Sequence, residues 1–225
     1  VKEFIEERDL TLFIVFDVSS SNEFGFERRK KEIGYDIAAS LMFAALRNND
    51  RVGLCLFTSE VELFIPPGKG KKHVLKLLRE LIYYEPKNRN TDIRAALSYL
   101  NNVIKKRSIV FIISDFLAPD FERPLKQLKN RHDVILVNIT DMREAQIPDI
   151  GYAFLEDQET GEQMLVDTSD PEFRARYTEL VKAKQDAFFA RMKRIGVDII
   201  QVNTSEPFYI PLQRFFKMRE RRVTR

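Results

Sequence analysis

Cysteine is almost absent from this chain of 225 residues, since Cys55 is its one example. A single cysteine excludes an internal disulfide, and no Cys/His cluster offers a zinc site. Cys55 lies within the apolar run 52–57, so we interpret it as a buried thiol rather than a reactive one. The lack of disulfides fits the reducing cytoplasm, and we expect a cytoplasmic protein.

Long hydrophobic runs are also lacking. No uninterrupted apolar stretch approaches the ~18 residues that favour a membrane-spanning helix, and the start of the chain does not resemble a signal peptide. The sequence begins Val1-Lys2-Glu3-Phe4 without an initiator methionine. We therefore interpret it as part of a longer protein that lacks an N-terminal segment, which leaves membrane association through that segment open.

The chain has no strong excess of charge of one sign, because 37 Lys and Arg residues face 34 Asp and Glu residues. The formal net charge of +3 is too small to predict a nucleic-acid partner. Hydrophobic residues make up 44% and charged residues 32% of the chain, as in an ordinary globular protein. Without a repeat or a linker, residues 1–225 are expected to form a single domain.

Sequence patterns of buried strands alternate with those of amphipathic helices along most of the chain. Apolar runs typical of strands buried on both faces alternate with apolar positions at helical spacing. The predicted strands are 10–17, 51–58, 62–66, 108–115, 133–138 and 197–202. The predicted helices are 30–48, 72–84, 91–105, 121–130, 171–194 and 207–222.

Two further features complete the predicted architecture. Residues 151–167 contain two short apolar segments around a polar turn, which indicates an inserted β-hairpin at an edge or rim of the sheet. The segments 51–58 and 62–66 are close enough to pair as an antiparallel edge, with Pro66-Pro67 ending the second. The fold class is therefore α/β: a doubly wound, mostly parallel, Rossmann-like sheet with helices on both faces and strand order 3-2-1-4-5-6.

Oxygen-bearing side chains are concentrated where the first strand ends. Asp17, Ser19 and Ser21 stand at alternate positions, so their side chains can converge on one point. In the predicted strand order, Asp115 ends the neighbouring strand, and Thr91 opens a helix. Ligands in such sheets bind at the carboxyl ends of strands where the order reverses. Oxygen donors favour Mg²⁺, with Mn²⁺ or Ca²⁺ as alternatives, over zinc or copper.

Each of these elements has a simpler interpretation when it is taken alone. An Asp followed by serines is often a turn, Thr91 is typical of a helix N-cap, and Asp115 is typical of a loop acid. The joint pattern on the expected elements favours a metal site at Asp17, Ser19, Ser21, Thr91 and Asp115.

The pattern Asp-x-Ser-x-Ser, a distant Thr and an Asp ending a later strand resembles the metal-ion-dependent adhesion site of von Willebrand A domains. The segments 49–54 and 66–70, together with the start of the chain and the late hairpin, resemble a bacterial branch called domain of unknown function fifty-eight. That branch is associated with MoxR-type AAA+ ATPases. Many von Willebrand A domains have glycine where this chain has Asn90 and Phe116.

The resemblance implies a non-catalytic module that binds a partner's Asp or Glu through the metal, as an adaptor or assembly factor for a MoxR-type ATPase. One alternative is a metal-dependent phosphatase, although Ser19 stands where phosphotransferases with Asp-x-Asp-x-Thr have a second acid. Another is a degenerate scaffold that binds no metal. The sequence contains no glycine-rich nucleotide loop, and His73 and His132 have no catalytic partner in it.

Overall fold

The structure is a computed structural model, and its side chains are described over most of the chain. The residues that it describes are 10–19, 26–88, 90–118, 120–141, 144, 146–156 and 163–223.

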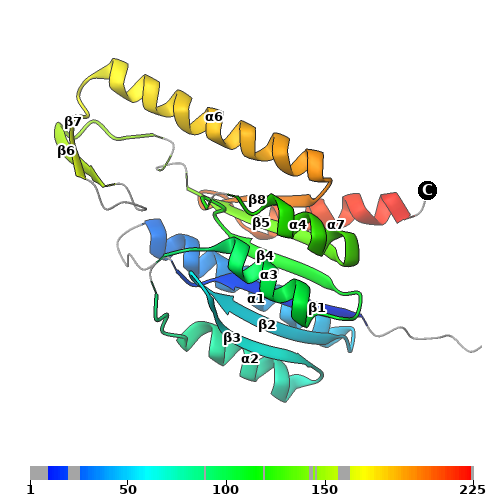
Figure 1. The fold of residues 1–225 in the computed structure, drawn as a ribbon. Helices are drawn as coiled ribbons and strands as arrows, with labels where there is room; N and C mark the ends of the chain where they lie inside the picture. The colour runs from blue at the N-terminus through cyan, green and yellow to red at the C-terminus, as the bar shows by residue number, and fades with distance from the viewer. Residues whose placement is uncertain are drawn as a thin grey trace, which may run out of the picture.

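A six-stranded sheet forms the centre of the fold (Figure 1). Its strands are β1 (Thr11–Asp17), β2 (Arg51–Phe57), β3 (Val61–Gly68), β4 (Ile109–Ser114), β5 (Asp133–Thr140) and β8 (Asp198–Asn203). They lie in the order β3-β2-β1-β4-β5-β8, and every neighbouring pair is parallel except β2 with β3. The predicted strand order and the antiparallel edge strand are both confirmed.

Helices cover both faces of this sheet and bury two separate apolar cores (Figure 1). One face carries α1 (Phe26–Arg47), α2 (Lys71–Tyr83) and α7 (Tyr209–Val223). The other carries α3 (Ile93–Val103), α4 (Glu122–Arg131) and α6 (Pro171–Ile195). Because side chains alternate along a strand, Ile14 packs into the first core and Val15 into the second. The central strands are apolar throughout for this reason.

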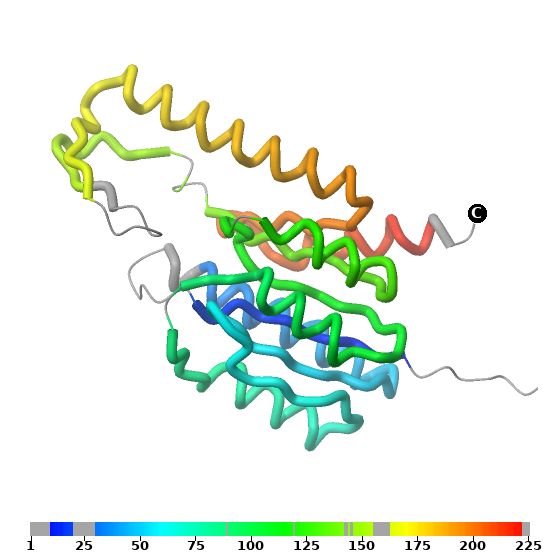
Figure 2. The backbone as a smooth tube through the Cα atoms, in the orientation of Figure 1, coloured from blue at the N-terminus to red at the C-terminus, as the bar shows by residue number. Residues whose placement is uncertain are grey.

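A hairpin and the first part of α6 extend away from the main sheet. Its strands, β6 (Tyr152–Glu156) and β7 (Gln163–Asp167), form a separate antiparallel sheet, so the hairpin predicted at 151–167 exists. Figure 2 traces the chain out to this hairpin and back along α6, whose buried residues Phe188 and Met192 lie in its second half. The hairpin does not extend the main sheet.

The ends of α6 follow the predicted capping. Asp170 is the N-cap and accepts a hydrogen bond from the Glu172 backbone N–H, and Pro171 occupies the first turn. Gly196 ends the helix with φ 74°, a left-handed conformation that glycine adopts at little cost.

The end of the third strand was predicted wrongly. The Pro66-Pro67 pair was expected to end the third strand, whereas β3 continues through both prolines to Gly68. Proline cannot donate a ladder hydrogen bond, but β3 is an edge strand that pairs on one side alone, with β2, and its register with β2 shifts between the pairs Val52–Gly68 and Leu54–Ile65, where the two prolines lie. The missing donors therefore cost little at this position.

Gly53 in β2 provides a test of the packing between the sheet and its second core. A Cβ atom at this position would lie 2.6 Å from Phe13 Cε1 and 3.2 Å from the Ile65 carbonyl oxygen. Phe13 is itself held by stacking on Phe64, with ring centroids 5.9 Å apart. We expect Gly53→Ala to lower the free energy of unfolding by about 1–3 kcal/mol, measured by urea denaturation.

Ser40→Ala is the matched control, since Ser40 is exposed on α1. Its effect should stay within about 0.5 kcal/mol. Equal stability of the Gly53 and Ser40 variants would contradict the close packing at β2.

Candidate metal site

The site is built where β1 and β4 end side by side. These strands are parallel neighbours at the point where the strand order reverses, and Phe16 is in register with Ile113. The next residues, Asp17 and Ser114, therefore lie next to each other, and the Ser114 hydroxyl donates to Asp17 Oδ2 at 2.8 Å. The predicted adjacency of the two strand ends is confirmed.

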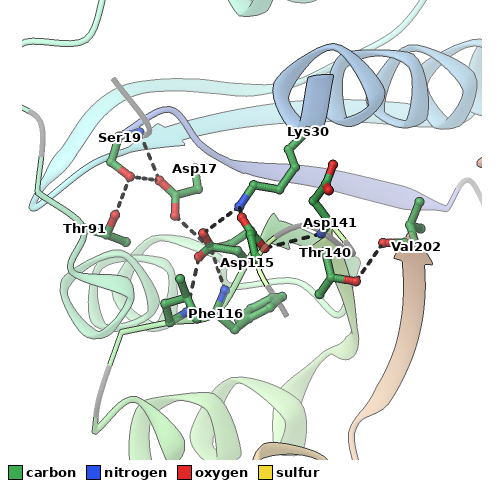
Figure 3. Close-up of polar contacts among 12 residues, drawn as sticks. Asp17, Ser19, Lys30, Thr91, Asp115, Phe116, Thr140, Asp141 and Val202 are labelled. Atoms are coloured by element: carbon green, nitrogen blue, oxygen red, sulfur yellow. Dashed lines mark hydrogen bonds and ion pairs between the residues drawn. The ribbon is translucent and has the colours of Figure 1, made fainter. Parts of the chain in front are cut away.

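Ser19 links the end of β1 to Thr91 (Figure 3). Its backbone N–H donates to Asp17 Oδ1 at 3.0 Å, and its hydroxyl donates to the same oxygen. The hydroxyls of Ser19 and Thr91 are hydrogen-bonded to each other. Three of the predicted donors, from segments more than 70 residues apart, therefore meet in one cluster.

Thr91 is not the N-cap of the following helix. Asp92 has that role, because its side chain accepts a hydrogen bond at 3.0 Å from the Ala95 backbone N–H. The alternative interpretation of Thr91 as a cap is thus wrong. The adjacent Asp92 satisfies the helix end, while the Thr91 hydroxyl bonds to Ser19.

The end of β2 holds both loops that carry these donors. The Phe57 carbonyl accepts a hydrogen bond from the Val18 backbone N–H at 2.9 Å. The next carbonyl, that of Thr58, accepts one from the Asp92 backbone N–H, also at 2.9 Å. Two consecutive carbonyls of one strand end therefore fix the backbone beside Ser19 and beside Thr91.

Asp115, directly after β4, lies in a network of charged side chains. Its Oδ2 atom is 3.4 Å from Lys30 Nζ, and its Oδ1 atom accepts a hydrogen bond from the Leu117 backbone N–H at 3.2 Å. Lys30 is 7% exposed and also lies 2.5 Å from Glu144 Oε1. Figure 3 shows Lys30 directed from α1 toward Asp115.

The pKa of Asp17 reflects its position between these groups. The net pKa is raised from 3.8 to about 6: burial raises it most, the hydrogen bond from Ser19 lowers it, and the charge of Asp115 raises it. The last effect means that the two carboxylates are close enough to repel each other. A divalent cation between them would offset both the desolvation and the repulsion.

The available donors fit a hard cation. The residues that meet here offer carboxylate and hydroxyl oxygens, which Mg²⁺, Mn²⁺ and Ca²⁺ prefer. Within the described part of the chain, no group of three or more His, Cys, Asp or Glu side chains is placed to hold a metal. The fifth predicted ligand, Ser21, lies outside the described residues, so four of the five predicted positions can be placed.

Phe116 occupies the position after the second Asp, where many von Willebrand A domains have glycine. Its φ of 57° lies in the left-handed region, which a bulky residue rarely adopts. The ring is 6% exposed and packs against Phe121 and Phe188, with centroids 6.0 and 5.7 Å away. Burial of the ring offsets the backbone cost and fixes the loop that carries Asp115.

Sequence reasoning missed Lys30, Ser114 and Glu144. Ser114 had a local signal, because it adjoins Asp115 at the end of a predicted strand. Lys30 and Glu144 had none, since tertiary packing brings Lys30 to Asp115 across 85 residues of chain and to Glu144 across 114.

The hairpin exposes apolar side chains. Tyr152, Phe154 and Leu165 are 75%, 69% and 55% exposed, and the register pairs Phe154 with Leu165 on the same face. Figure 1 shows the hairpin at the end of the fold toward which β1 and β4 run. The exposed face and the donor cluster therefore lie at the same end.

The strand order, the two helical layers and the position of the donors define a von Willebrand A-like domain. The family described as protein of unknown function DUF58 matches residues 1–187, and the chain belongs to this family. None of the helices in the described residues combines the length and apolarity needed to cross a membrane.

Sequence relatives occur in mycobacteria. Uncharacterized protein Mb1516 of Mycobacterium bovis is 26% identical over 225 residues, which cover 98% of this chain and 71% of the relative. Uncharacterized protein MAV169 of Mycobacterium avium is 29% identical over 160 residues, covering 70% of this chain and 94% of the relative.

Two solved structures share the fold. BatB from Bacteroides thetaiotaomicron has a TM-score of 0.56 at 15% identity, covering 94% of this chain and 99% of its own. An aerotolerance-related membrane protein from Bacteroides fragilis has a TM-score of 0.55 at 16% identity, covering 86% and 90%. At these identities the likeness is one of fold.

Lys30→Met tests the charged network around Asp115. The substitution keeps most of the apolar stem but removes the ammonium between Asp115 and Glu144, whose side chains are 30% and 27% exposed. Because partial hydration limits the penalty, we expect a loss of about 1–3 kcal/mol in the free energy of unfolding, measured by urea denaturation.

Lys72→Met on α2 makes the same charge change at an exposed position. It should alter the free energy of unfolding by less than about 0.5 kcal/mol. If both variants were equally stable, the Lys30 network would make no net contribution to the fold.

Proposed function

We propose that this domain is a non-catalytic protein-binding module that uses a divalent cation, Mg²⁺ in the first place, to bind an acidic side chain of a partner. Asp17, Ser19, Thr91 and Asp115 would hold the cation, together with Ser21. The bound cation would supply positive charge at the carboxyl edge of the sheet. The partner would supply an Asp or Glu oxygen.

The observation that carries this proposal is the convergence of Asp17, Ser19 and Thr91. The Ser19 hydroxyl is hydrogen-bonded both to the Asp17 carboxylate and to the Thr91 hydroxyl, across two separate loops. Helix capping does not account for Thr91, since Asp92 is the cap. A cluster of oxygen atoms at a strand-order reversal is a suitable place for a cation.

The composition of the cluster supports binding of an anion by the loaded site. Two carboxylates balance a divalent cation, and the hydroxyls of Ser19 and Thr91 add no charge. A coordination position on the cation that these residues do not fill would favour an anionic oxygen from another molecule. The exposed apolar side chains of Tyr152, Phe154 and Leu165 offer additional contact area at the same end of the domain.

We further propose that the partner is a MoxR-type AAA+ ATPase or its client, which would make this domain an adaptor or assembly factor. This assignment follows from the resemblance to the family and is supported by membership of it. A non-catalytic role is supported by Ser19, which stands where a phosphotransferase of the Asp-x-Asp type needs a second carboxylate.

Metal binding is tested by calorimetric titration of metal-free protein with Mg²⁺ and Mn²⁺. We expect saturable binding to one site, which Asp17→Asn abolishes because it removes one of the two charges that balance the cation. At about 100 times the Kd, Mg²⁺ should raise the free energy of unfolding by about 2.7 kcal/mol. EDTA should reverse the increase.

Asp36→Asn is the matched control, since Asp36 is exposed on α1 and away from the cluster. This variant should bind like the wild type. Absence of binding to either ion would support a scaffold without a metal instead. Turnover of p-nitrophenyl phosphate that depends on Mg²⁺ and on Asp17 would support the phosphatase.

Partner capture is tested with a purified MoxR-type AAA+ ATPase on a biosensor surface. We expect the wild-type domain to bind in Mg²⁺ and the Asp17→Asn variant to fail in the same buffer. Comparison of variants is required here because EDTA would also remove the metal from the nucleotide of the ATPase. Equal binding by both variants would contradict a metal bridge.

A further inference from the structure

The loop between α2 and α3 brings Thr91 to the candidate metal site without regular secondary structure of its own. Its position must therefore be set by contacts with other elements. Thr91 is followed by Asp92, which is attached to the Thr58 carbonyl. The backbone of the segment that precedes Thr91 is attached elsewhere, through Lys87 and Asn88, to one carboxylate on β3.

That carboxylate belongs to Glu62. The Lys87 backbone N–H lies 2.9 Å from Glu62 Oε2 and 3.2 Å from Oε1, and the Asn88 backbone N–H donates to Oε1 at 3.2 Å. The Thr58 hydroxyl donates to Oε1 at 2.6 Å, and the Tyr84 hydroxyl also bonds to Glu62. One side chain thus satisfies two consecutive loop amides and connects them to the turn between β2 and β3.

The hydrogen bonds that Glu62 accepts favour the ionised form of its carboxylate. Burial, the largest single effect, raises its pKa, but the hydrogen bonds from Thr58, Lys87 and Asn88 together lower it below the ordinary value. Hydrogen bonds to an ionised acceptor are stronger than neutral ones. A carboxylate that accepts several donors holds the loop more firmly than a neutral amide would.

We propose that Glu62 is a positioning residue for the metal site, because its carboxylate holds the loop that presents Thr91 to Ser19. It does not touch the donor cluster and acts through the backbone at 87–88. Thr58 holds the chain on the other side of Thr91, since its carbonyl oxygen accepts a hydrogen bond from the Asp92 backbone N–H. This inference rests on the proposed metal-binding function.

The test compares Glu62→Gln with Glu60→Gln in the chain of 225 residues by calorimetric titration with Mg²⁺. Glu60 is an exposed acid two residues away, and it accepts one described hydrogen bond, from Asn88 Nδ2 at 3.2 Å. Both variants make the same charge change, two positions apart in the chain. We expect Glu62→Gln to weaken Mg²⁺ affinity about 10-fold or more, as loss of an outer partner of a metal ligand does, and Glu60→Gln to bind as the wild type does.

Two further measurements separate positioning from general destabilisation. Hydrogen exchange should show loss of protection at the Lys87 and Asn88 amides in Glu62→Gln, with protection of the central strands retained. Thr58→Val, which removes one donor to Glu62 without a charge change, should weaken Mg²⁺ affinity in the same direction.

The outcomes distinguish failure of the positioning role of Glu62 from failure of the proposed metal-binding function. Wild-type binding together with equal affinities in Glu62→Gln and Glu60→Gln would overturn the positioning role and leave the metal-binding module intact. Absence of Mg²⁺ and Mn²⁺ binding by the wild type would overturn both.

Discussion

Desolvation of the half-buried Asp17 carboxylate at the end of a central strand is the constraint on which the rest of the site depends. A carboxylate in this position loses hydration, and its raised pKa of about 6 expresses that cost. Hydrogen bonds from Ser19 and Ser114 compensate part of it. Those hydrogen bonds fix the loop after β1 and the end of β4. The half-buried Asp17 carboxylate therefore holds the ends of two strands together.

The fold could be predicted from the sequence because the sheet is covered on both faces. Strands such as β1 and β4 are then apolar at every position between their ends, and their order follows from the alternation with helices. Asp17 and Asp115 were identifiable for the same reason, since each interrupts an apolar run where its strand ends. The local sequence pattern was sufficient to predict the strands that are buried on both faces, because such strands admit mainly apolar residues.

The remaining features depend on long-range contacts or on local competition. Lys30 and Glu62 look like ordinary helix and strand charges in the sequence, and only the packing of α1 and of the α2–α3 loop gives them their partners. Thr91 and Asp92 are both good capping residues, and the sequence does not decide between them. The prolines of β3 were misjudged because edge position, which makes them harmless, is a property of the assembled sheet.

The charges around the site fall into two groups. Lys30 lies 2.5 Å from Glu144 and 3.4 Å from Asp115, so Glu144 compensates most of its charge. Under the proposed function, Asp17 and Asp115 would then balance a divalent cation, while Ser19 and Thr91 would contribute neutral oxygens. A third carboxylate among the ligands would make the loaded site negative and repel an acidic partner. Under the proposed function, serine at position 19, which disfavours phosphotransfer, would therefore also favour capture of a carboxylate.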